Sequence, residues 1–86
     1  MPAISRFFGI VIAMYYDDHE PAHFHVRYAE HSAKINIETL ELIDGELPRR
    51  AIALTLEWAA LHREQLRQNW SKARQGVQLM AIEPLE

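Results

Sequence analysis

The sequence predicts an α+β domain, in which a four-stranded antiparallel meander packs on one long C-terminal helix and a short extended segment follows. Between residues 23 and 38 the chain alternates twice between apolar and polar residues, which is the period of half-exposed strands. Residues 49–69 contain neither glycine nor proline and are rich in residues that favour helices. Because 86 residues is the length of one domain, we treat residues 1–86 as a single domain.

The first predicted strand is the run GIVIAMYY, residues 9–16. Its β-branched, aromatic and aliphatic residues are continuous, which is typical of a strand covered on both faces. We assign the residues before it to the fold rather than to a signal peptide, because the run ends in aromatic and acidic residues without a cleavage pattern. Residues 17–22 then form a loop, since Pro21 has no backbone N–H to donate to a sheet.

The second and third predicted strands are HFHVRYA and SAKINIE, joined by a short turn. The first of them places two sets of side chains on opposite faces: Phe24, Val26 and Tyr28 on one, and His23, His25 and Arg27 on the other. A turn at residues 30–31 sets His23 opposite Glu38, whereas a turn at residues 29–30 moves the pairing by two residues. Both registers keep the apolar set on one face, so we expect that face to lie inside.

A short fourth strand, LELID at residues 40–44, is expected to end at Gly45. Pro48 fits the first turn of a helix, where a missing N–H costs no hydrogen bond. The helix runs from Arg49 to about Asn69. Its apolar stripe consists of Ala51, Leu54, Trp58 and Leu61, widened by Ile52, Ala59 and Leu66.

The chain after the helix carries further apolar residues. Trp70 and Ala73 indicate a kink or a short second helix that Gly76 ends. Residues 77–85 contain too many apolar side chains for a free tail, and they predict a strand or an extended cover. We expect Trp58 and Trp70 to anchor the core.

His23 and His25 are the candidate catalytic pair. Two residues apart on a strand, they share one face at about 6–7 Å between Cα atoms, which suits proton exchange or a shared metal ion. His19 or Glu20, from the preceding loop, is the candidate third metal ligand beside His23 and His25, because zinc needs three or four ligands. Glu38 on the next strand would orient His23. The plainer interpretation is that these histidines lie on the polar face of a strand and bind no cofactor. In the metal-binding alternative, the ion is zinc or nickel.

The candidate binding residues are Arg27, Arg50, Tyr16 and Glu38. Arg50 follows Arg49 in the predicted first turn of the helix, where cations oppose the helix dipole. Such a placement indicates either an anion site or a salt bridge to a nearby acid. Tyr16 can position a phosphate or donate a proton, but a tyrosine on an apolar strand more often belongs to the core or its rim.

Composition and missing motifs exclude several classes of protein. A net charge of −3 argues against strong non-specific binding to nucleic acid. Without cysteine, the chain has no disulfide, thiolate nucleophile or cysteine-ligated zinc. The sequence has no glycine-rich phosphate loop, no G-x-S-x-G elbow and no H-E-x-x-H helix. No apolar run reaches the roughly 18 residues of a membrane span, and we expect a cytoplasmic protein.

Four segments, taken in order, resemble a bacterial domain-of-unknown-function family, number 4160: MPAISRFFGIVIAMYY, HEPAHFHVRY, INIETLELIDGELPRRA and LEWAALHREQLRQNW. The resemblance extends from Met1 to Leu85. The family typically has proline where this chain has Ala22, a glycine-rich turn in place of residues 29–31, and often glycine in place of Leu40. We expect these departures to affect turns rather than the site.

The resemblance implies a context and no established catalytic activity. Such proteins are often encoded beside members of family number 2442, in pairs of toxin–antitoxin type, so a small protein partner is expected. RNA and a second copy of the chain are further candidate partners. In one hypothesis the protein cleaves RNA: His23 and His25 exchange protons while Arg27 and Arg50 hold phosphate. In the other it is a non-catalytic module that docks its partner through the histidine face or the helix.

Overall fold

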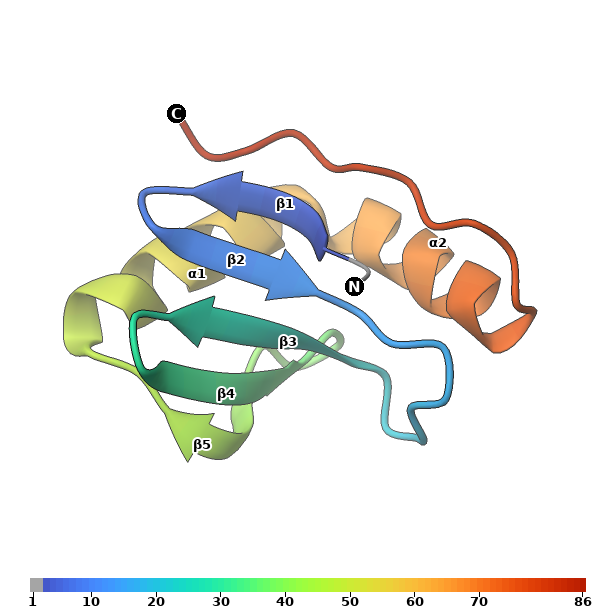
Figure 1. Cartoon of the computed structure of the whole chain (residues 1–86), viewed down its shortest axis with the longest axis horizontal. Coiled ribbons are helices and arrows are strands. Elements are labelled where there is room, and N and C mark those ends of the chain that lie inside the picture. The colour runs from blue at the N-terminus through green and yellow to red at the C-terminus, as the bar shows by residue number, and fades with distance from the viewer. Residues whose placement is uncertain (1–2) are drawn as a thin grey trace.

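The computed structural model describes residues 3–86 as a five-stranded antiparallel sheet with two helices behind it (Figure 1). The elements are β1 (Ala3–Phe7), β2 (Ile10–Ala13), β3 (His23–Tyr28), β4 (His31–Asn36), β5 (Leu42–Glu46), α1 (Arg49–Leu61) and α2 (Arg63–Arg74). The strands follow one another across the sheet in chain order. This confirms the α+β class and the meander, with one strand and one helix more than predicted. None of these helices is long and apolar enough to cross a membrane.

The predicted strand at residues 9–16 is wrong in its bounds, because the chain turns back just before the apolar run. β1 and β2 form a hairpin whose turn residues, Phe8 and Gly9, have φ values of 50° and 81°. Positive φ at both central residues gives the tight turn that matches the twist of paired strands. Val11 on β2 is only partly buried, so this strand is covered on one face rather than on both.

β3 and β4 pair in the register that has its turn at residues 29–30. His23 lies opposite Asn36, so its pairing with Glu38 is wrong by two residues. The faces are as predicted, and Phe24 is fully buried. A shift of two residues leaves every side chain on its face, because the side-chain period of a strand is two.

Gly45 lies inside the observed strand β5, which corresponds to the strand predicted at residues 40–44, instead of ending it. That strand, β5, begins at Leu42 and not at Leu40, and it ends at Glu46. Gly45 has a φ of 83°, and a Cβ atom there would lie 2.8 Å from the Cα atom of Ala33. Glycine is needed at this position because the backbones of β4 and β5 approach closely.

The helix predicted from Arg49 to about Asn69 is two helices, because the chain breaks at His62, where φ is −122°. Leu61, a member of the predicted apolar stripe, is 69% exposed at this break. The second helix therefore begins well before Trp70, the residue at which the sequence indicates a kink. Separating the helix into two lets each present its own buried side to the sheet.

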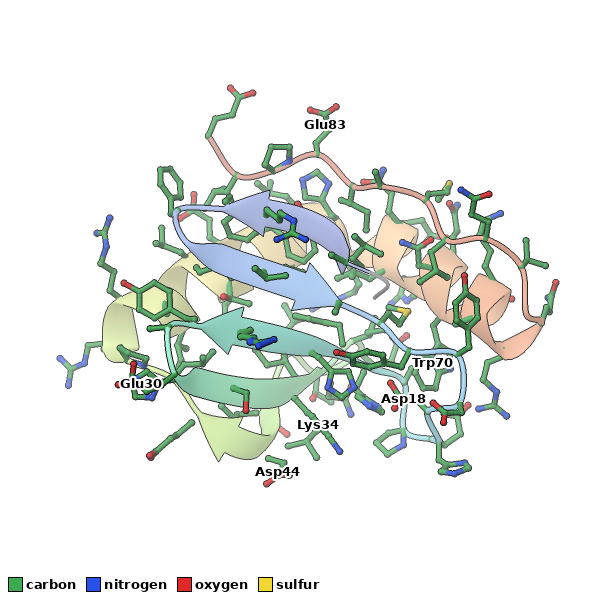
Figure 2. The ribbon with its side chains drawn as sticks, in the orientation of Figure 1. Asp18, Glu30, Lys34, Asp44, Trp70 and Glu83 are labelled. Carbon is green, nitrogen blue, oxygen red and sulfur yellow. The ribbon has the colours of Figure 1, made fainter. Side chains whose placement is uncertain are left out.

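Residues 77–86 form an extended cover without helix or strand, in agreement with one of the two predictions for this segment. The backbone N–H of Ile82 donates to the carbonyl of Ile4 on β1, and Ile82 is buried. The indole N–H of Trp58 donates to the carbonyl of Glu83, which is labelled in Figure 2. The segment thus connects the edge of the sheet to α1.

Trp58 lies at the centre of the core. Its ring centroid is 5.4 Å from that of Phe7 on β1 and 6.0 Å from that of Phe24 on β3. It is fully buried, as predicted, and Trp70 on α2 is 8% exposed. With both helices on one side, the other side of the sheet is left to carry polar side chains.

Candidate functional site

The side of the sheet turned away from the helices, here called the outer face, carries side chains in rows that cross the strands. The strand registers place one row at Arg6, Val11, Arg27, Ser32 and Glu46, and the next at Ala13, His25, Lys34 and Asp44. Neighbours in a row are close enough for their side chains to interact. The meander therefore gathers on one surface cations that lie far apart in the sequence.

Three of these cations, Arg6, Arg27 and Lys34, have no acidic partner within 4.0 Å among residues 3–86. Two arginines of α2 differ, because each is paired with acids. Arg67 binds Glu38 at 2.7 Å, and Arg74 binds Glu20 at 3.3 Å. No direct ion pair therefore neutralises these three cations, although the acids Asp44 and Glu46 lie in the same two rows of the outer face.

A hollow of about 520 Å³ opens on the outer face between β2, β3, β4 and β5. Its lining includes Tyr15, His25, Arg27, His31, Lys34 and Asp44. Figure 2 labels Lys34 and Asp44, together with Glu30 on the turn that borders the hollow. Polar and charged groups therefore converge on a depression that is open to the surface.

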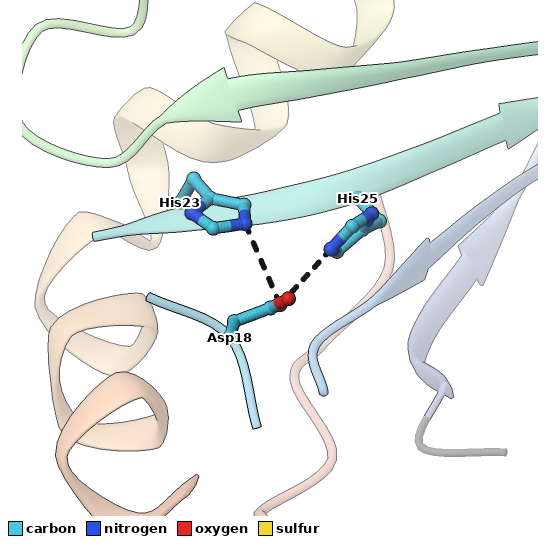
Figure 3. Close-up of side chains that lie close together, drawn as sticks. All are labelled: Asp18, His23 and His25. Carbon is cyan, nitrogen blue, oxygen red and sulfur yellow. Dashed lines mark hydrogen bonds and ion pairs between the residues drawn. The ribbon is translucent and has the colours of Figure 1, made fainter. Parts of the chain in front are cut away.

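At one end of this face, Asp18 lies between two histidines (Figure 3). Its Oδ2 atom is 2.9 Å from Nε2 of His25 and 3.4 Å from Nε2 of His23. The imidazoles come from β3, where their spacing of two residues places them on the same face. The carboxylate comes from the loop that Pro21 separates from the strand. We call Asp18, His23 and His25 the Asp–His–His cluster.

His23 is the buried member of the Asp–His–His cluster, with 7% of its side chain exposed. Its Nδ1 atom is 2.7 Å from the carbonyl oxygen of Pro21. Since a carbonyl only accepts hydrogen bonds, Nδ1 carries the proton. Its Nε2 atom has no hydrogen-bond partner among residues 3–86. The ring packs against that of Trp70, with centroids 5.3 Å apart.

His25 is the accessible member, with 23% of its side chain exposed. Its Nε2–H donates to the carboxylate of Asp18, and the edge of its ring meets Tyr15, with centroids 4.6 Å apart. A carboxylate that accepts from one ring nitrogen fixes the tautomer and leaves the other nitrogen free to accept a proton. His25 and Asp18 therefore have the arrangement of a general base.

The structure does not bring His19 into the Asp–His–His cluster. His19 is exposed, and the acidic residue that precedes it supplies the third group instead. In the sequence, residues 17–20 of this loop all carry side chains that can bind a metal ion, so nothing in the pattern singles out Asp18. Alternation identifies the face of a strand, but it carries no information on which loop residue folds over that face.

Glu38 also lies apart from His23. It is exposed, and both its oxygens accept from Arg67, at 2.7 and 2.9 Å. This hydrogen bonding holds the pKa of the Glu38 carboxyl below its ordinary value of 4.5, and it raises the pKa of Arg67. The negative charge of Glu38, in the turn between β4 and β5, is therefore paired with an arginine of α2.

The other predicted binding residues fall in different places. Arg27 lies on the outer face, and Tyr16, which is 46% exposed, follows β2. Arg50 is exposed in the first turn of α1, which belongs to the layer behind the sheet (Figure 1). Arg27 and Arg50 thus belong to opposite layers of the protein.

Comparison with known proteins identifies the family. Residues 9–71 match the model of a family described as Domain of unknown function (DUF4160). This chain belongs to the DUF4160 family. The match confirms the resemblance noted in the sequence, and it includes β2–β5 and the Asp–His–His cluster of this DUF4160 protein. Neither a curated protein nor a solved structure matches the chain.

Proposed function

We propose that this DUF4160 protein is the RNA-binding member of a two-protein module of toxin–antitoxin type in the bacterial cytoplasm. The RNA-binding surface is the outer face of the sheet. The observation that carries the proposal is the presence of three cations, Arg6, Arg27 and Lys34, in adjacent rows of that face, without acidic partners in the described part of the chain. Phosphates of nucleic acid bind to such arginine and lysine side chains.

The shape of the outer face supports single-stranded RNA as the ligand. The hollow is an open depression in the sheet, whereas a duplex requires an element that enters its groove. Aromatic rings flank the cations: Tyr15 lines the hollow and Tyr16 is 46% exposed beside it in the chain. Unpaired bases stack on aromatic side chains while arginines hold the backbone, which is how sheet surfaces bind single strands.

The positions of the two histidines agree better with a protein that binds RNA than with one that cleaves it. An acid–base pair that cleaves RNA needs two imidazoles that reach the substrate. His25 meets this requirement, but His23 is buried and its Nδ1–H is held by Pro21. We therefore place His25 at the margin of the RNA site and assign His23 to the interior. A protein partner from the same module would compete for this face.

The proposal is tested by fluorescence anisotropy with an end-labelled single-stranded RNA at low salt. The test variant is Arg6→Ala with Arg27→Ala. Its matched control is Arg49→Ala with Arg50→Ala, which removes the same charge from the layer behind the sheet. Removing one contact to a phosphate lowers the slope of log K against log salt by about 0.7, so the test variant is expected to lower it by about 1.4.

The control variant is expected to keep both affinity and salt slope. Equal weakening in the two double variants would mean that charge alone, and not the outer face, determines binding. RNA recovered from the complex is expected to be intact. Shortened RNA that disappears with His25→Ala would instead establish cleavage.

A further inference from the structure

We infer that the Asp–His–His cluster is a binding site for a divalent transition-metal ion, and that Zn²⁺ is the ion that fits it best. The inference concerns Asp18, His23 and His25 and does not depend on RNA binding. It differs from the sequence prediction in one ligand, because Asp18 takes the place of His19 or Glu20.

The distances between the three groups suit one ion. Each residue offers one ligand atom, and these atoms all lie within 4.8 Å of one another. Zinc bound at about 2.0–2.1 Å in a tetrahedron separates its ligand atoms by about 3.3–3.4 Å. The distance from His23 Nε2 to Asp18 Oδ2 is 3.4 Å, and that from His25 Nε2 to the same oxygen is 2.9 Å. For an ion to enter, the side chains need move only slightly, and the proton of the His25 Nε2–H has to pass to its Nδ1 atom so that Nε2 can bind the metal.

The Nε2 nitrogen of His23, which has no hydrogen-bond partner among residues 3–86, supports the metal site independently of the distances. The side chain of His23 is 7% exposed, and its Nε2 atom faces the cluster. Because Nδ1 carries the proton, Nε2 presents a lone pair to a carboxylate oxygen of Asp18, so that two acceptors face each other. Such a buried contact is unfavourable as it stands. A cation between the two atoms makes it favourable.

The contact between His23 and Pro21 is also what a metal ligand requires. Histidines that bind metals nearly always donate their second ring N–H to a carbonyl or carboxylate, which fixes the tautomer and the ring plane. Here the donor is Nδ1 of His23 and the acceptor is the carbonyl of Pro21, at 2.7 Å. The ring of Trp70 packs on the same imidazole and limits its movement further.

The donor set selects the class of ion. Two imidazole nitrogens and one carboxylate suit zinc and its neighbours among the transition metals, whereas Mg²⁺ and Ca²⁺ take oxygen ligands. Asp18 and His25 have 18% and 23% of their side chains exposed, so solvent reaches the site. Three protein ligands with solvent access leave the fourth position of zinc to water.

A proton is the alternative to a metal ion. With a proton on Nε2, His23 would donate a hydrogen bond to Asp18, and a metal ion would have to displace that proton. Binding measurements therefore decide between the two.

The experiment uses the full chain without an affinity tag, stripped of metal and titrated with Zn²⁺ alone by calorimetry. We expect about one ion per chain. Asp18→Asn and His25→Ala are expected to weaken binding by at least about 100-fold, since even residues that only orient ligands cost 10–100-fold. Both positions are partly exposed, so these variants avoid the core damage that replacing His23 would cause. Circular dichroism spectra in the absence of metal check that they fold.

The matched controls are His31→Ala and His19→Ala. His31 is partly exposed and paired with Glu30 at 3.7 Å, and His19 is exposed. Both controls are expected to bind Zn²⁺ as the wild type does, and Zn²⁺ is expected to raise the Tm of the wild type but not of His25→Ala. Absence of stoichiometric binding by the wild type overturns the inference, as does unchanged affinity in Asp18→Asn and His25→Ala. Loss of binding in His19→Ala overturns the assignment of Asp18.

Discussion

Replacing Asn69 by alanine removes a single buried amide that holds the C-terminal segment against α2. Asn69 is fully buried, which is unusual for this polar residue. Its Nδ2 atom donates to the carbonyl of Met80 at 2.9 Å, and its Oδ1 atom accepts from the N–H of Met80 at 2.8 Å. The amide therefore pairs with one backbone unit as a neighbouring strand would.

The expected loss in the free energy of unfolding of Asn69→Ala follows from these two hydrogen bonds. Each is worth about 1 kcal/mol net, and each backbone group of Met80 that stays buried without a partner adds about 1–3 kcal/mol. If the C-terminal segment moves into water, the backbone groups of Met80 regain hydrogen-bond partners. That movement, however, exposes Ile82 and breaks the hydrogen bond from Trp58 to Glu83. We expect Asn69→Ala to lower the free energy of unfolding by about 2–4 kcal/mol. For a domain of this size that is roughly 10–30 °C in Tm.

The assay combines urea unfolding, followed by tryptophan fluorescence, with hydrogen exchange of the Met80 amide. Gln68→Ala, one residue earlier in α2 and exposed, is the matched control and is expected to change the free energy of unfolding by less than about 0.5 kcal/mol. In Asn69→Ala the Met80 amide is expected to exchange freely while amides of β3 stay protected. A decrease below about 0.5 kcal/mol, with the Met80 amide still protected, would refute the reasoning.

Two further predictions concern a turn and a salt bridge. Ala29 has a φ of 53°, a conformation in which glycine is less strained than alanine. Ala29→Gly is therefore expected to raise the free energy of unfolding in urea by about 0.5–1 kcal/mol. Its control, Ala53→Gly in α1, is expected to lower that free energy by about 1 kcal/mol. Destabilisation by Ala29→Gly would contradict this account of the turn. Because the pKa of Glu38 in the folded state is below its ordinary value of 4.5, its pairing with Arg67 stabilises above that pH and loses this effect as the pH falls through the lowered pKa. Glu38→Gln is therefore expected to lower Tm slightly at pH 7 and not at about pH 2; an equal effect at both would contradict the assigned pairing.

The differences between the predicted and the observed strands have two causes. Alternation has a period of two, so it identifies the buried face of β3 but is unchanged when the partner strand shifts by two residues. The turn decides the register, and the sequence left turns at residues 29–30 and 30–31 both open, because the pattern of faces is the same for each. The hairpin at Phe8 and Gly9 is missed because only the apolar run that follows it has the composition of a buried strand.

For the candidate site, too, one part could be predicted from the sequence and the other depended on the tertiary structure. The spacing of His23 and His25 by itself placed both imidazoles on one strand face, because side-chain direction in a strand is a local property. The sequence likewise determined the α+β class, since burial patterns of strands and helices are local too. Tertiary structure alone decided that Asp18, and not His19 or Glu38, closes on the histidines, and that Arg27 and Arg50 lie in different layers. Those outcomes depend on the path of a loop and on which side of the sheet α1 packs, and both are set by contacts between residues distant in the chain.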